Sequence, residues 1–169
     1  MFKHCPQCKS TEISFVSQRY WKCANCDFVY FHNTAGGVGA IISCHNELLF
    51  TVRAKHPCKG KLDLPGGFVD FHETLEQALS RELMEELNVS IAPSQWQYLC
   101  SFPNQYLYKN INYNTIDNAF VCELNEKPKI HLEKTEILEA KWIAIEDVDV
   151  SAIAFPSLAN AVAKFISAS

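Results

Sequence analysis

The sequence predicts a small four-cysteine zinc ribbon followed by an α/β domain. Two Cys-x-x-Cys pairs stand near the N-terminus, and strand-like apolar runs come before and after an amphipathic helix expected at residues 75–87. The same helix carries a cluster of glutamates that a plain surface helix would not need. A chain of 169 residues that is 48% hydrophobic is long enough for one domain with a sizeable core and a small module.

The zinc ribbon is predicted from four cysteines, Cys5, Cys8, Cys23 and Cys26. Zinc prefers four thiolates in a tetrahedron, and each Cys-x-x-Cys turn supplies two of them. A module of this size needs a bound metal, because its hydrophobic core alone is too small to stabilise the folded state. A redox role for one pair is disfavoured, since a redox motif stands between a strand and a helix. We therefore expect structural Zn²⁺.

Short strands are expected at residues 13–16 and 19–22 of this module. The boundary is predicted after Asn33, which gives a zinc ribbon at 1–33 and a second domain at 34–169. In that domain, alternation and β-branched content predict strands, with a closing amphipathic helix at 157–167. The expected strands are 37–42, 47–52, 62–64, 96–102, 118–124 and 140–145, with a turn at 44–46 between the first two.

The central helix has clear start and stop signals. Thr74 is expected to cap its N-terminus, and Gln77 three residues later completes a capping box. Asn88 is expected to end it in the left-handed conformation. Pro65-Gly66-Gly67 upstream predicts a tight turn with no side chain in the way of a metal or a phosphate.

Three glutamates of this helix, Glu82, Glu85 and Glu86, create an electrostatic problem. At about 100° per residue, Glu82 and Glu86 fall within about 20° of the direction of Leu75, on the apolar stripe. Buried like charges are costly unless a cation accompanies them. Carboxylates without softer ligands nearby suit Mg²⁺ or Mn²⁺. Arg81 is placed to hold carboxylates by bidentate bonding. The alternative is a solvated acidic helix.

Residues 67–89, GFVDFHETLEQALSRELMEELNV, resemble the Nudix box. This resemblance implies an α/β/α sandwich with a mixed sheet, and hydrolysis of a nucleoside diphosphate linked to another group with the help of Mg²⁺ or Mn²⁺. It also implies that the Gly66 carbonyl is a further metal ligand beside the glycine turn at Gly67, and that Glu73 and Arg81 orient the acids. Asn88 departs from the family pattern, which usually has Gly there.

The general base is not fixed by the resemblance, because the family takes it from the box or from a later loop. Glu136 is our candidate for a later acid, with Glu133 and Glu139 as rivals. Surface positions remain the ordinary expectation for at least two of these three.

The substrate must be recognised outside the box. Tyr106, Tyr108 and Tyr113 lie in an aromatic stretch that could stack a nucleobase, although packing in an edge strand explains the pattern equally well. A zinc ribbon before a Nudix domain is similar to NADH pyrophosphatases, but the Ser-Gln-Pro-Trp motif typical of them is absent from the sequence. ADP-ribose, NAD(H), dinucleoside polyphosphates and similar conjugates stay open as substrates.

Two rival functions remain. The ribbon carries four Lys or Arg among aromatic residues and could contact nucleic acid or capped RNA, but two acidic residues and four thiolates on one zinc ion cancel that charge. Its aromatics could instead pack on the catalytic domain or on a second copy of the chain, as in a homodimer. A non-catalytic nucleotide sensor is the other rival, disfavoured because no acid of the box is lost.

Net charge and hydropathy set the remaining bounds. A net charge of −4 argues against a dedicated nucleic-acid binder. No apolar run reaches the length of a membrane helix, and the first residues are unlike a signal peptide. We therefore expect a cytoplasmic enzyme with a small nucleotide conjugate as its substrate and no membrane partner.

Overall fold

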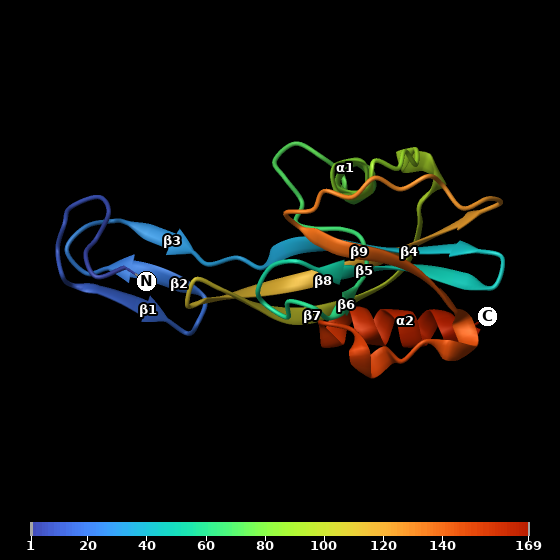
Figure 1. Cartoon of the computed structure of the whole chain (residues 1–169). Coiled ribbons are helices and arrows are strands. Elements are labelled where there is room, and N and C mark those ends of the chain that lie inside the picture. The colour runs from blue at the N-terminus through green and yellow to red at the C-terminus, as the bar shows by residue number, and fades with distance from the viewer. Residues whose placement is uncertain (1, 169) are drawn as a thin grey trace. The chain divides into compact units, whose positions relative to one another are not determined.

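The computed structural model describes residues 2–168, which divide between Thr34 and Ala35 into two units. The predicted combination of a small cysteine-bearing sheet and a mixed α/β domain is confirmed (Figure 1). Among the described residues, no helix is long and apolar enough to cross a membrane. Each unit is described on its own below.

The smaller unit is a three-stranded antiparallel sheet in the order β1-β2-β3. Its strands are β1 (Ile13–Val16), β2 (Tyr20–Cys23) and β3 (Val29–Phe31). The first two were expected from the sequence, β2 one residue earlier than it lies. The third was missed because it is only three residues long and exposed throughout, so its sequence shows no alternation.

The larger unit is built on a six-stranded mixed sheet in the order β6-β5-β4-β8-β7, with β9 also paired to β5. β4 and β8 run parallel, and all other pairs are antiparallel. The strands are β4 (Ala35–Cys44), β5 (Glu47–Arg53), β6 (Leu62–Asp63), β7 (Gln97–Tyr108), β8 (Ile111–Leu124) and β9 (Ile137–Ala144).

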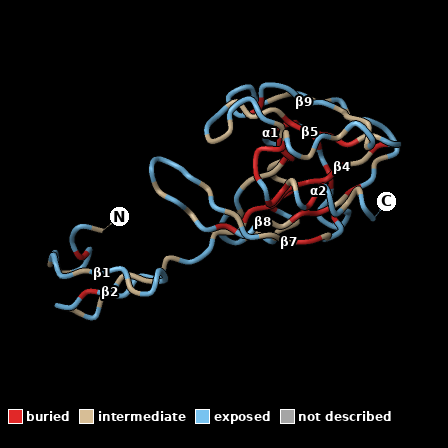
Figure 2. The backbone as a smooth tube through the Cα atoms, turned by 90° about the horizontal axis from the view of Figure 1, so that it is seen from below, coloured by how far each residue is buried: buried red, intermediate tan, exposed pale blue. Residues whose placement is uncertain are grey.

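Two helices cover opposite faces of this sheet, α1 (Leu75–Leu87) and α2 (Pro156–Ala168) (Figure 1). Each helix closes its own apolar core, and the fully buried stretches run along the central strands (Figure 2). The predicted sandwich is therefore confirmed. Three short 3₁₀ helices complete the unit, at Pro93–Gln95, Ile145–Asp147 and Val150–Ala152.

The ends of α1 are as predicted. The Thr74 hydroxyl accepts the backbone N–H of Gln77 at 3.3 Å, and the Gln77 side chain accepts the backbone N–H of Thr74 at 2.8 Å. Asn88 closes the helix with φ 56° and ψ 37°. The backbone N–H groups of His131 and Glu133 then donate to the carbonyls of the last turn, each at 2.9 Å. A loop distant in sequence thus completes the C-terminal cap.

The glycine turn is held against the edge of β4. β4 and β5 pair only beside their shared turn and then separate, so the rest of this edge of β4 is open. The segment 65–69 fills it: the backbone N–H groups of Ala40 and Val38 donate to the carbonyls of Pro65 and Gly67 at 2.8 and 2.9 Å. This pairing delivers the loop before α1 to the sheet.

The hairpin of β7 and β8 is longer than predicted. The sequence indicated strands only at 96–102 and 118–124, whereas the pairing continues to Tyr108 and Ile111. Lys109 and Asn110 make the turn, with φ of 46° and 63°. Pro103 and the many polar residues in the outer half of the hairpin interrupt the apolar alternation by which a strand is predicted. They are tolerated because β7 is an edge strand.

We predict that Asn88→Gly leaves the free energy of unfolding unchanged or slightly raised, because Gly adopts the left-handed conformation without strain. Asn88→Val should lower it by about 1–2 kcal/mol. Chemical denaturation measures both, with Ser90→Val as the control at an exposed position of the same loop. Equal stability of Asn88→Val and Asn88→Gly would contradict the proposed role of the left-handed cap.

Candidate active site

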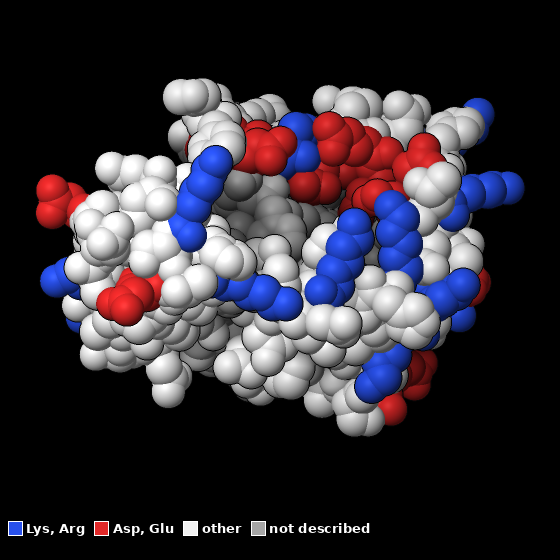
Figure 3. Space-filling model, turned by 90° about the vertical axis from the view of Figure 1, so that its left-hand side faces the viewer, with Lys and Arg blue, Asp and Glu red and all other residues white. Residues whose placement is uncertain are grey.

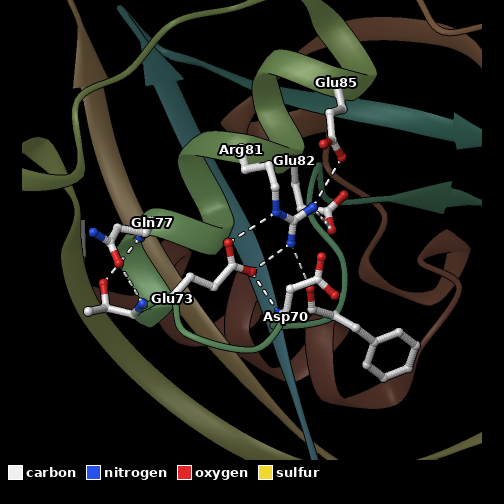
Figure 4. Close-up of polar contacts among 8 residues, drawn as sticks. Asp70, Glu73, Gln77, Arg81, Glu82 and Glu85 are labelled. Carbon is white, nitrogen blue, oxygen red and sulfur yellow. Dashed lines mark hydrogen bonds and ion pairs between the residues drawn. The ribbon is translucent and has the colours of Figure 1, made fainter.

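Arg81 organises the acidic end of the site (Figure 4). Its guanidinium donates twice to Glu73, at 2.8 and 3.1 Å, and to Glu82 and Glu85 at 2.9 and 3.1 Å. It also donates to the Phe68 carbonyl at 3.0 Å. The hydrogen bonds from Arg81 hold the pKa of Glu73 below its ordinary value. Arg81 therefore joins the loop before α1 to the acidic face of the helix.

The two glycines of the turn allow the carboxylates to approach the backbone. The Gly66 N–H donates to Glu86 at 3.1 Å, while a side chain at Gly66, whose φ is 142°, would collide with the Val38 carbonyl. A β-carbon on Gly67 would lie 2.4 Å from a Glu82 oxygen. Gly66 thus meets Glu86 through its N–H, and a metal-ligating role of its carbonyl stays a prediction.

Glu86 is the buried acid of the cluster, with 8% of its surface exposed. Burial raises its pKa from 4.5 to about 8, the Gly66 N–H opposes this, and Glu82, Asp63 and Glu136 add to it. Burial also raises the pKa of Glu82, against the effect of Arg81. On the face shown in Figure 3, acidic side chains gather in one band. Burial and mutual repulsion thus disfavour the ionised form of these carboxylates. A hard divalent cation beside them would offset both effects.

Glu136 reaches the same site from another part of the chain. It precedes β9, lines the cavity described below, and pairs with Lys55, while its backbone carbonyl accepts the N–H of Ala54 at 2.8 Å. Its rivals are engaged elsewhere. Glu133 accepts the backbone N–H of Thr135 at 3.0 Å, and Glu139 pairs with Lys141 at 3.1 Å.

A cavity of about 800 Å³ opens beside the acids. Glu82, Glu86, Arg81 and Glu136 line one end of it, and Tyr106, Tyr108 and Tyr113 line the β7–β8 wall. The Tyr106 ring contacts the rings of Phe68 and Phe155, with centroids 5.3 and 5.8 Å apart. The structure thus brings the predicted tyrosines and acids into one cavity. Glu85 and Glu73 are outside its lining and meet the site through Arg81.

Several residues of the cavity were missed from the sequence. Arg53 and Asp63 form an ion pair on its wall, where burial raises the pKa of Asp63 to about 6 against the attraction of Arg53. Asn104 and Asp117 come from the two strands of the hairpin and bond to each other at 2.9 Å. No local motif marks these residues. Only the alternation of side chains along the long hairpin would have pointed to the second pair.

The four predicted cysteines of the smaller unit come together. Their sulfurs all lie within 4.8 Å of one another, and the pairs Cys5–Cys26 and Cys8–Cys23 are each 3.6 Å apart. Bonds of about 2.3 Å from a tetrahedral zinc ion would place neighbouring sulfurs about 3.8 Å apart. The donor set therefore fits zinc. Among residues 2–168, it is the one group of three or more such ligand atoms gathered this closely.

Comparisons with known proteins agree with this geometry. The family model described as NUDIX domain matches residues 32–166. A curated relative, the NAD-capped RNA hydrolase NudC of Escherichia coli (strain SMS-3-5 / SECEC), is 26% identical over 146 residues, which cover 86% of this chain and 53% of that protein. The chain therefore spans about half the length of the curated relatives it matches.

Solved structures show the same fold. A NUDIX hydrolase from Nitrosomonas europaea superposes with a TM-score of 0.72 at 24% identity, covering 98% of this chain and 91% of the other. The NUDIX domain of Shewanella oneidensis NrtR, determined with ADP ribose, gives a TM-score of 0.67 at 23% identity, covering 82% and 90%. At these identities the likeness establishes the fold alone.

We predict that Glu86→Gln stabilises the protein in buffer free of Mg²⁺ and Mn²⁺. Wild-type Glu86 titrates near its ordinary 4.5 when unfolded and near 8 when folded, so unfolding releases a proton between these pH values. The free energy of unfolding therefore falls as pH rises from about 4.5 to about 8 and levels off above. Glu86→Gln lacks this loss.

The expected gain of Glu86→Gln at pH 8 is on the order of 1–3 kcal/mol, and it should vanish below pH 4.5. Scanning calorimetry across pH measures it, after a chelating resin has removed free divalent ions. Glu146→Gln is the control, since Glu146 is exposed and outside the cavity. A pH-independent difference between Glu86→Gln and wild type would show that burial of the charge is not the cause.

We also predict that the smaller unit needs its metal. Cobalt(II) added to the reduced, metal-free protein should give the visible spectrum of a tetrahedral thiolate site, and Cys23→Ser should abolish it, because Cys23 is buried in the cluster. Cys58→Ser, outside the cluster, should leave it unchanged. NMR should show residues 2–34 losing their signal dispersion when the metal is removed. Retained dispersion without metal would contradict this dependence.

Proposed function

The chain belongs to the Nudix family, and from that premise we propose that it hydrolyses the pyrophosphate bond of a nucleoside diphosphate linked to a second group, with Mg²⁺ or Mn²⁺. The observation that carries the proposal is the set of acids around Arg81 and the glycine turn, at one end of a cavity that has an aromatic wall. A degraded box would favour a non-catalytic sensor, but every acid is present here.

The acids Glu82, Glu85 and Glu86 are assigned to hold the ion or ions. When bound, such an ion supplies charge neutralisation at the phosphates and a water of lowered pKa. Arg81 and Glu73 are positioning residues: they fix the carboxylates of Glu82 and Glu85 and so define where the phosphates come to rest. The Gly66 N–H orients the Glu86 carboxylate from the other side.

Glu136 is assigned as the general base that takes the proton of the attacking water. Its carboxylate pairs with Lys55, and this hydrogen bond raises the pKa of Lys55. The contact of its backbone with Ala54 holds it at the cavity. Glu133 and Glu139 fit this role less well because neither lines the cavity and each is bound elsewhere.

The substrate class is a nucleotide conjugate. A cavity of about 800 Å³ has the size typical of sites for small molecules, and its aromatic wall suits a flat ring. ADP-ribose, NAD(H) and dinucleoside polyphosphates all carry both a nucleobase ring and a pyrophosphate group. Structural zinc in the smaller unit is part of the same proposal.

A nucleotide-capped RNA is a second candidate substrate. The curated relatives that match most of this chain carry the name NAD-capped RNA hydrolase, and a cap contains the same type of bond. Free NAD and NAD-capped RNA separate the two cases. A much higher kcat/KM for the capped RNA would favour a role in RNA processing.

We predict that Glu86→Gln lowers kcat/KM by about 100-fold or more, because it removes a negative charge from the metal site. Hydrolysis of ADP-ribose, NADH, diadenosine polyphosphates and NAD-capped RNA is followed by chromatography with Mg²⁺ and with Mn²⁺. Glu146→Gln should retain wild-type rates. If Glu86→Gln kept full turnover on a confirmed substrate, the proposed site would be wrong.

A further inference from the structure

One face of the β7–β8 hairpin forms a continuous wall of the cavity. Side chains at alternate positions of both strands line it, and the register places Asn104 opposite Thr115 and Tyr106 opposite Tyr113. The outer part of this wall is aromatic and the inner part is polar. Its members are Asn104, Tyr106, Tyr108, Tyr113, Thr115 and Asp117.

Asp117 is the centre of the polar part. Its carboxylate accepts the Asn104 amide at 2.9 Å, the Thr115 hydroxyl at 3.0 Å, and the Ser157 hydroxyl. These donors come from β7, β8 and the start of α2, and the two hydroxyl residues are each 3% exposed. Three elements therefore fix one carboxylate on the cavity wall, which makes this a built feature and not a surface cluster.

The carboxylate has only neutral partners. No Lys, Arg or His lies within ion-pair distance of Asp117 among the residues that the structure describes. The hydroxyl groups of Thr115 and Ser157 donate their hydrogens to this carboxylate, and Asn104 donates one of its two amide hydrogens. What the cluster retains is mainly acceptors: the remaining lone pairs of Asp117 and of the two hydroxyls, and the amide oxygen of Asn104.

A group that binds there must supply hydrogen-bond donors, because an acceptor would meet other acceptors at a partly buried negative charge. The neighbouring wall favours a flat ring, since Tyr106 lies beside Phe155 and Tyr108, with centroids 5.8 and 6.5 Å away. Gly37 on the adjacent strand adds to the space: a β-carbon there would come within 2.8 Å of a carboxylate oxygen of Asp117.

We propose that Asp117 is a specificity-determining residue of the cavity, and that it selects nucleotides whose ring carries an amino group. Guanine, adenine and cytosine have such a group, which supplies two N–H donors at the ring edge, whereas hypoxanthine and uracil offer only a single ring N–H beside a carbonyl oxygen, an acceptor that this cluster disfavours. Asn104 contributes an amide beside the carboxylate, and Thr115 and Ser157 position Asp117. This inference rests on the proposed function for the orientation of the substrate, with its phosphates at the acidic end.

Binding of nucleoside monophosphates tests the proposal without turnover. Calorimetric titration of the zinc-loaded full chain with GMP, AMP, CMP, IMP and UMP, in Mg²⁺, compares rings on a common phosphate. We expect at least one amino-bearing nucleotide of the pairs GMP/IMP, AMP/IMP and CMP/UMP to bind about 10-fold more tightly than its partner. Asp117→Asn should bring that ratio close to one.

Asn114→Ala is the matched control, because Asn114 is exposed on the opposite face of β8 and outside the cavity lining. It should keep the wild-type ratio. If Asp117 only fastens α2 to the hairpin, Asp117→Asn lowers the melting temperature and leaves the ratio unchanged, which overturns the proposal. Ratios within about twofold for wild type, or no binding of any of the five, overturn it without a variant.

The two proposals fail separately. Loss of hydrolysis in Glu86→Gln bears on the metal site, whereas the ratios measured with monophosphates involve no bond cleavage. An amino preference in a protein that hydrolyses no conjugate would sustain the role of Asp117 and refute the proposed reaction.

Discussion

The hydrogen bonds of Arg81 are the constraint on which the site depends. A single guanidinium donates hydrogen bonds to Glu73, Glu82 and Glu85 and to the backbone carbonyl of Phe68. Because Glu73 and Phe68 belong to the loop and the other two acids to the helix, these bonds fix the loop against α1. They also offset the repulsion among carboxylates that share one helical face. Without them, only the hydrogen bond from the Gly66 N–H to Glu86 would link this loop to the acids of the helix.

A second constraint is the open edge of β4. Since β4 and β5 separate after their turn, the backbone of 65–69 can pair with β4 and carry the glycine turn to the acids. Only glycine fits at Gly66, where a β-carbon would lie 2.1 Å from the Val38 carbonyl. The sheet therefore sets the position of the turn, and Arg81 sets the position of the helix relative to it. The acids proposed to hold the metal lie where these two meet.

The features that the sequence predicted well are those with local causes. Thr74, Gln77 and Asn88 act on backbone groups within a few residues, so the ends of α1 were predicted to the residue. Asp117 was not predicted, because its partners include Ser157, forty residues away, and its neighbours look like an irregular polar stretch. The outer half of the β7–β8 hairpin was also missed, because strands whose side chains face a cavity lack the simple apolar alternation of a core strand. Glu136 was proposed by resemblance, and its approach to α1 depends on the loop that caps the helix.

The cavity is thus acceptor-rich at two places with different demands. At the acidic end, burial raises the pKa of Glu86, so a divalent cation, as proposed for this site, would stabilise its ionised form. At the hairpin, Asp117 accepts hydrogen bonds from neutral donors and has no cation within ion-pair distance in the part of the chain that the structure describes, which is why we propose that it selects the amino group of a ring. The Tyr106 ring, between the rings of Phe68 and Phe155, adds an aromatic surface to the same cavity. A ligand that satisfies both ends carries metal-bound phosphates at one side and an amino-bearing ring at the other, and the direction in which it enters follows from that polarity.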